Sequence, residues 1–250
     1  MVGHLLLRGM IVGAVAGLLA FGFARLYGEP AVAHAIALEE AASAANGAAA
    51  EAEPELVSRE VQAGLGLFTG IVTFGTALGG LFALAFAFSY GRLTTLGPRG
   101  TAALLALGGF VALVLVPGLK YPPNPPAVGD PETIGYRTEL FFVMLVLSLA
   151  AMAFATQLAR RTWDRLGPWN AALLGVGAYG VLVALIQFGL PAINEVPEAF
   201  PATLLWEFRT AALGIQAILW ATLGLAFGAV AERYLAPTRQ GRIAPAYASR

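Results

Sequence analysis

Six long apolar runs without charged residues constrain this chain more than any other feature of its sequence. A helix needs about 20 apolar residues to cross the hydrocarbon core of a bilayer. Five runs meet that length directly, and the first meets it once it includes the arginines at its ends, whose long side chains reach the headgroups. We therefore predict an all-α integral membrane protein, a six-helix transmembrane bundle. The predicted spans are residues 5–26, 63–90, 101–119, 140–158, 169–190 and 211–231.

Basic residues in the loops predict the orientation of these helices, because lysine and arginine are retained on the cytoplasmic side. With the N-terminus inside, ten of the fifteen basic residues lie on the inner side. An even number of spans places the C-terminus inside as well, so the predicted topology is N-in/C-in. Residues 1–236 then form a single membrane domain, and residues 237–250 form a cytoplasmic tail.

Acidic residues divide even more unevenly in this topology. Thirteen of the fifteen lie outside, so the outer face carries a net charge of −8 and the inner face +8. A negative outer face concentrates cations, which favours a cation as the solute. The alternative is that acidic residues collect outside simply because basic residues are kept inside.

The first span has a competing interpretation as a signal peptide, because small residues of the cleavage-site type, Ala31-Val32-Ala33, follow it. Glycine at every fourth position favours a helix that packs against another helix instead. The same spacing recurs in the second and sixth spans. The glycines concerned are Gly9, Gly13 and Gly17, then Gly66 with Gly70, Gly75 with Gly79, and Gly224 with Gly228. The long second run should tilt, extend beyond the bilayer or break near Gly79 and Gly80.

Three outer segments interrupt the spans. The insertion 28–62 predicts a short helix over residues 34–45, followed by a flexible linker over residues 46–55. The segments 117–137 and 191–201 hold nine of the fifteen prolines, so we predict stiff, non-helical outer loops there. Such loops line a substrate entrance or form a structural cap, and the sequence favours neither. The structural residues predicted in them are Pro122, Pro123, Asn124, Pro125, Pro126 and Asn194.

These segments also carry a resemblance to a known family. Residues 115–131 read LVPGLKYPPNPPAVGDP, residues 193–197 read INEVP and residues 205–209 read LWEFR. With GLGLFTG at 64–70 and AER at 231–233, the chain resembles the CbtA-type predicted cobalt transporter subunits over nearly its whole length.

The resemblance implies a membrane subunit of bacterial cobalt uptake, located in the cytoplasmic (inner) membrane and linked to cobalamin synthesis. Co²⁺ is then the transported ion, and no cofactor is bound permanently. The implied partners are the lipid bilayer, the divalent metal ion and a small histidine-bearing membrane subunit of the CbtB type.

The outer side offers ligands for such an ion, since cobalt(II) accepts imidazole nitrogen and carboxylate oxygen. An oxygen-rich, transient site suits transport, because the ion must leave again. The alternative for the outer histidine is an ordinary solvated loop residue. The predicted ligands are Glu39, Glu40, Asp130, Glu195 and His34.

Other classes of function find no support in the sequence. It contains no phosphate loop, no HExxH motif and no nucleophile elbow, so we do not expect an enzyme. The basic residues are scattered among short loops, which argues against binding of nucleic acid. The alternative from a different class is a non-transporting membrane scaffold or accessory subunit, which docks a metal-handling partner through the outer proline segments.

Overall fold

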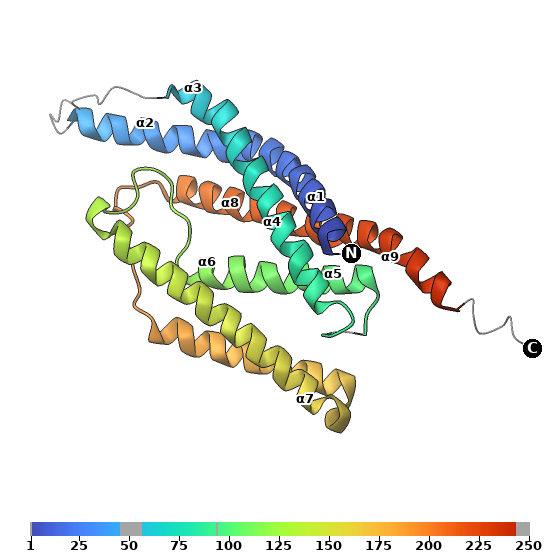
Figure 1. Ribbon diagram of the computed structural model, residues 1–250. Helices are drawn as coiled ribbons and strands as arrows, with labels where there is room; N and C mark the ends of the chain where they lie inside the picture. The colour runs from blue at the N-terminus through green and yellow to red at the C-terminus, as the bar shows by residue number, and fades with distance from the viewer. Residues whose placement is uncertain (1, 46–56, 94, 244–250) are drawn as a thin grey trace, which may run out of the picture. The chain divides into compact units, whose positions relative to one another are not determined.

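The computed structural model describes residues 2–45, 57–93 and 95–243, and the elements in those ranges are all helices (Figure 1). The α-helices are α1 (Val2–Phe23), α2 (Glu29–Ala45), α3 (Arg59–Val61), α4 (Leu67–Ser89), α5 (Pro98–Phe110), α6 (Val116–Lys120), α7 (Ile134–Gly189), α8 (Ala202–Thr222) and α9 (Gly228–Ile243). The π-turns are η1 (Ala24–Gly28), η2 (Gln62–Gly66), η3 (Val111–Leu115) and η5 (Leu223–Phe227), and η4 (Pro131–Thr133) is a 3₁₀ turn.

The π-turns join neighbouring α-helices without interrupting them, so the described residues contain five long helices. By length and composition each could cross a membrane. The prediction of an all-α protein built from long apolar helices is therefore confirmed. The five helices are Val2–Ala45, Arg59–Ser89, Pro98–Lys120, Pro131–Gly189 and Ala202–Leu235.

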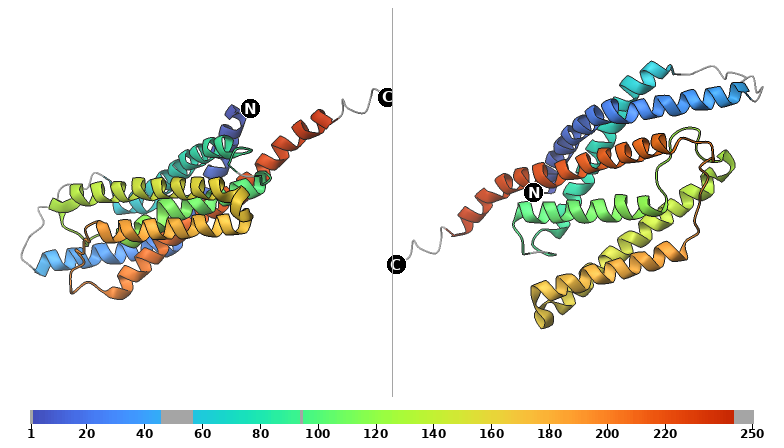
Figure 2. Two further views of the ribbon diagram at one scale, coloured as in Figure 1. Left: turned by 90° about the horizontal axis from the view of Figure 1, so that it is seen from below. Right: turned by 180° about the vertical axis from the view of Figure 1, so that it is seen from behind.

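Helix α7 folds back on itself at Gly167 (Figures 1 and 2). Gly167 has φ +74°, a left-handed conformation that glycine adopts without steric cost. Pro168 follows, and its missing N–H is harmless at the start of a helix. The predicted spans 140–158 and 169–190 thus fall in two arms of one hairpin, and the first arm continues as helix up to the turn.

The helices pack into two compact units. The first contains α1, α3, α4, most of α5 and the last long helix from Thr210 onward. The second contains most of α2, the chain from Gly108 through α6 and α7, and the start of α8 as far as Arg209.

In the first unit, α1 and α4 approach each other through glycine. A Cβ on Gly13 would lie 2.2 Å from the carbonyl oxygen of Gly75, and a Cβ on Gly79 would lie 2.2 Å from that of Gly9. Gly17 faces the backbone of Ile71 in the same way. Lipid provides no hydrophobic drive between helices, so close backbone packing must supply the attraction. The prediction that the first helix packs through its glycines is confirmed.

Of the remaining predictions about glycine, one is confirmed and two are wrong. Gly224 and Gly228 pack on α5, against Ala106 and Ala102 respectively, as their spacing predicts. Gly70 has no neighbouring atom within 4 Å, and Gly66 contacts only its own helix, so the packing prediction for that pair is wrong. A small residue permits close approach but does not choose the face that meets a partner. The suggested break near Gly79 and Gly80 is also wrong, because α4 continues through both.

The outer segments need two corrections. The helix predicted over residues 34–45 begins earlier, because α2 starts at Glu29 and continues directly from η1. The predicted linker, residues 46–55, lies outside the described residues. Pro117 lies in α6, and residues 134–137 in α7, so only residues 121–130 of the first proline segment are without helix. Pro117 is tolerated because η3 precedes it, and a π-turn widens the helix where proline would otherwise clash with the preceding turn. The second segment, residues 191–201, is non-helical as predicted.

The contact between α1 and α4 predicts a position-specific effect of adding one methyl group. Gly79→Ala should destabilise the protein by about 1–3 kcal/mol, because its Cβ would overlap the Gly9 carbonyl. Gly70→Ala, in the same helix but in open space, should leave stability unchanged or raise it by up to about 1 kcal/mol. Unfolding by SDS in detergent micelles measures both, and equal stability of the two variants would contradict the packing.

Candidate functional site

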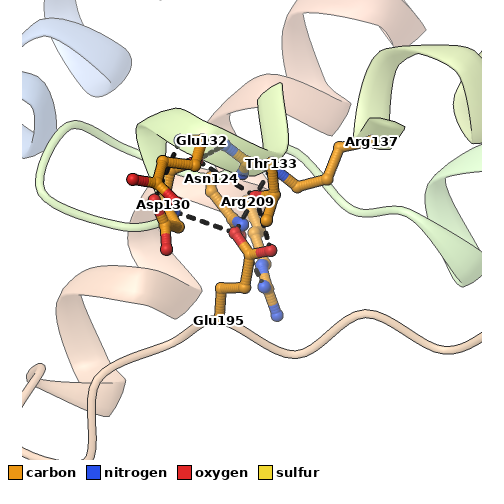
Figure 3. Close-up of polar contacts among 7 residues, drawn as sticks. All are labelled: Asn124, Asp130, Glu132, Thr133, Arg137, Glu195 and Arg209. Carbon is orange, nitrogen blue, oxygen red and sulfur yellow. Dashed lines mark hydrogen bonds and ion pairs between the residues drawn. The ribbon is translucent and has the colours of Figure 1, made fainter. Parts of the chain in front are cut away.

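The two proline-rich segments of the second unit meet at the carboxylate of Glu195 (Figure 3). Glu195 Oε2 accepts a hydrogen bond of 2.9 Å from the backbone N–H of Asp130. Its Oε1 accepts one of 2.7 Å from the hydroxyl of Thr133. Arg137 Nε lies 3.3 Å from Oε2 as an ion pair. One carboxylate therefore joins the segment before α8 to the segment that leads into α7.

A local turn positions these donors. The Asp130 side chain caps η4, because its Oδ1 accepts a hydrogen bond of 2.9 Å from the N–H of Glu132, and Pro131 occupies the first position of that turn. Thr133 Oγ1 lies 2.7 Å from Glu195 Oε1 and 3.0 Å from the Asp130 carbonyl oxygen. A hydroxyl has one proton, so it donates to one of them at a time, and the carboxylate is the stronger acceptor.

Arg137 completes the turn by covering Gly129. Gly129 has φ +116°, and a Cβ there would lie 2.3 Å from a guanidinium nitrogen of Arg137. The second terminal nitrogen of Arg137 donates to the Asp130 carbonyl oxygen over 3.2 Å. Glycine is required at position 129 for its backbone conformation and for the close approach of this arginine.

A second arginine holds the middle of the first proline segment. Arg209, on α8, donates from Nε to the Pro123 carbonyl oxygen over 3.3 Å and from a terminal nitrogen to Asn124 Oδ1 over 2.8 Å. A proline-rich stretch forms few internal backbone hydrogen bonds, so its carbonyls depend on such outside donors. Figure 3 shows this contact behind the Glu195 cluster.

Two hydrogen bonds, one donated from each helix, join the ends of α6 and α7. Lys120 Nζ donates to the Gln187 carbonyl oxygen over 2.6 Å, and the Gln187 side-chain amide donates to the Val116 carbonyl oxygen over 3.0 Å. The Tyr121 hydroxyl then donates to the Pro191 carbonyl oxygen over 2.9 Å. A lysine ammonium is favourable here, since carbonyls at a helix C-terminus carry partial negative charge.

The other residues predicted for the outer loops differ in burial. Pro125 is buried, and its carbonyl oxygen accepts a hydrogen bond of 3.3 Å from the N–H of Val128. Pro122 and Pro126 are half-buried. Pro123 and Asn194 are exposed.

The predicted metal ligands fall into two groups. His34, Glu39 and Glu40 are all exposed on α2, but at about 100° per residue the two glutamates point away from the histidine's face. Asp130 and Glu195 meet in the network of the proline segments. No group of three or more His, Asp or Glu that could hold a metal occurs in the part of the chain that the structure describes. The shared site therefore stays a prediction.

Sequence reasoning gave no role to several residues that the structure connects. Thr133 and Arg137 hold Glu195, although they lie about sixty residues away in the chain. In the first unit, Glu29 is buried and forms an ion pair with Arg59. The signal available for the first pair was the Asp130-Pro131-Glu132-Thr133 sequence, a cap followed by proline that marks a fixed turn. Glu29 directly precedes Pro30, and this position gave no comparable signal for its ion pair with Arg59.

The donors around Glu195 keep its carboxylate charged. The hydrogen bond from Thr133, then that from the Asp130 N–H, and then the charge of Arg137 hold the pKa of Glu195 below its ordinary range. Both oxygens of Glu195 are thereby engaged. Asp130, which is exposed and has only Oδ1 in a hydrogen bond to Glu132, is the more accessible carboxylate for a cation.

The lowered pKa of Glu195 predicts a dependence of stability on pH. A carboxylate with a lowered folded-state pKa stabilises the fold above its unfolded pKa, about 4.3, and this contribution is lost as the pH falls through the folded-state pKa. Glu195→Gln should therefore be less stable than the wild type at pH 7, and the difference should shrink on acidification. Glu198→Gln, an exposed neighbour in the same segment, is the control. Thermal unfolding in detergent between pH 7 and pH 3 measures both, and a constant difference for Glu195→Gln would contradict the argument.

The chain matches a known protein family over most of its length. Residues 2–232 match the family model described as "Probable cobalt transporter subunit (CbtA)". No curated protein and no solved structure is significantly similar to the chain.

Proposed function

Because this chain belongs to the CbtA family of probable cobalt transporter subunits, we propose that it is the membrane subunit of a bacterial cobalt uptake system linked to cobalamin synthesis. The family match over nearly the whole chain carries the proposal. A transporter subunit with five long apolar helices is a multi-pass membrane protein. We place it in the bacterial cytoplasmic (inner) membrane, with Co²⁺ as cargo rather than as a permanently bound cofactor.

We propose six crossings with both termini in the cytoplasm. Two observations support this arrangement. The turn at Gly167 divides α7 into two arms, so the five long helices provide six helical segments. Ten of the fifteen basic residues then lie on the cytoplasmic side.

Reporter fusions test this topology. Green fluorescent protein fused after Gly167 should fluoresce, because the turn of α7 would lie in the cytoplasm. Alkaline phosphatase fused after Gly129 should be active, because the first proline segment would lie outside. Fluorescence of a fusion after Gly129 would overturn the six-crossing arrangement.

We further propose that the outer acidic face captures the cation before transport. Asp130, Glu39 and Glu40 are exposed and suit a transient oxygen-rich site. Glu195 has its oxygens engaged by two hydrogen-bond donors and by the ion pair with Arg137, so its contribution would be to hold Asp130 in place. His34 is exposed on α2 and would add a nitrogen ligand.

Uptake of radioactive cobalt by cells expressing the full chain tests the capture site. Asp130→Asn combined with Glu39→Gln and Glu40→Gln keeps the shape of each side chain but removes its charge. Loss of true ligands should weaken the apparent affinity roughly tenfold or more at any ionic strength. The charge-matched control combines Glu60→Gln, Glu139→Gln and Glu198→Gln, three exposed outer acids, and should produce a small effect that salt removes. Equal affinities for the wild type and the triple variant would overturn the capture site.

The second candidate is a membrane scaffold that docks a metal-handling partner, such as a small histidine-bearing subunit of the CbtB type. It is favoured by the contacts of Arg209 and Glu195, which give residues 121–130 and 190–201 a fixed shape with exposed Pro123 and Asn194. Expression of the chain alone, of the partner alone and of both together separates the candidates. Uptake by the chain alone supports transport by this subunit, whereas uptake by the partner alone supports the scaffold.

A further inference from the structure

The turn of the α7 hairpin carries an exposed cluster of arginine residues. Arg160, Arg161 and Arg165 occupy the last two turns of the first arm, directly before Gly167, and all three are exposed. Asp164 is the acidic residue among them. The cluster lies at the end of the hairpin labelled α7 in Figure 1, within the second unit.

Helical spacing divides these charges into two pairs. Residues four apart lie on the same face of a helix, so Arg160 shares a face with the opposite charge of Asp164. Arg161 and Arg165 are also four apart, and their like charges repel each other. Asp164 is also three residues after Arg161, so it is a neighbour of both Arg160 and Arg161. One aspartate cannot neutralise three arginines, so this exposed end of the arm keeps a net charge of +2.

A phosphate suits this pair. An arginine guanidinium presents a planar fork of N–H donors that binds phosphate oxygens in pairs. An anion seated between Arg161 and Arg165 would replace their mutual repulsion with two attractions. A metal cation would be repelled from the same face.

Aromatic residues at the same level along the hairpin indicate the depth at which that phosphate lies. Trp163 is 45% exposed and Trp169 is 73% exposed, and they flank the turn on its two arms. Leu166, between them, is 44% exposed. Tryptophan and exposed leucine next to arginine are costly in water but favourable at the headgroup level of a bilayer, where the ring meets acyl chains and the N–H meets water.

We propose that Arg161 and Arg165 form a binding site for the phosphate of an anionic phospholipid, with Trp163 and Trp169 holding the turn of α7 at the headgroup level. The site rests on the proposed crossing of α7 through the membrane, with this turn on the cytoplasmic side. It assigns the protein a lipid ligand in addition to its proposed cargo. Removal of each arginine should weaken lipid binding roughly fivefold, the effect of one basic residue near an anionic membrane surface.

Native mass spectrometry of the purified full chain, titrated with phosphatidylglycerol or phosphatidylcholine in detergent micelles, tests the proposal. The wild type should bind phosphatidylglycerol more tightly than phosphatidylcholine. Arg161→Gln with Arg165→Gln should reduce that preference roughly 25-fold. Arg92→Gln with Arg233→Gln removes the same charge from the predicted cytoplasmic side of the first unit and should retain the preference.

Three results would overturn the proposal. An equal loss in both double variants would mean that general charge, and not this pair, attracts the lipid. A wild type without preference for phosphatidylglycerol would exclude an anionic lipid site. Inorganic phosphate that abolishes lipid binding at equal concentration would identify a site for the free anion. Size-exclusion elution and thermal unfolding confirm that each variant is folded, and the assay does not depend on cobalt transport, so its failure leaves the proposed function intact.

Discussion

Close backbone contact between α1 and α4 is the interaction on which the first unit depends. In lipid, two helices gain nothing by hiding apolar side chains, because the acyl chains are equally apolar. Gly9, Gly13, Gly75 and Gly79 remove the side chains between the two backbones, so the helices come close enough for van der Waals attraction. Around this contact the unit adds ordinary packing, including the edge-to-face rings of Phe82, Phe86 and Phe227.

The second unit depends on a different constraint. Backbone N–H and C=O groups in its non-helical segments need hydrogen-bond partners. Residues 121–130 and 191–201 satisfy only some of their carbonyls through turns, as at Pro125 and Pro197, and long side chains supply further donors. Lys120, Tyr121 and Arg209 each donate to a backbone carbonyl of another segment. Glu195 performs the opposite task by accepting from the backbone N–H of Asp130. The rigidity of prolines lowers the entropy cost of fixing such loops.

Much of the helical framework follows from the sequence, because apolar length and glycine spacing are local properties. Residues 140–158 and 169–190 were predicted as separate helices, and the structure places the turn between them at Gly167. Pro117 fell both in the predicted span 101–119 and in the predicted non-helical segment 117–137, and the structure agrees with the span. The π-turn that accommodates this proline has no clear sequence signal. The partnership of Glu195 with Thr133 and Arg137 was out of reach, because nothing local indicates which distant segment a loop carboxylate will meet.

The α7 hairpin is closed at both ends, which limits how it moves. The chain joins its arms at Gly167, and Glu195 joins the segment after the second arm to Thr133 at the start of the first. Shear of one arm past the other by a single residue, about 1.5 Å, would stretch the 2.7 Å hydrogen bond between Thr133 and Glu195 beyond its range. In the proposed transport cycle this hairpin would therefore move as one rigid body, by tilting or rotation, with the register between its arms unchanged.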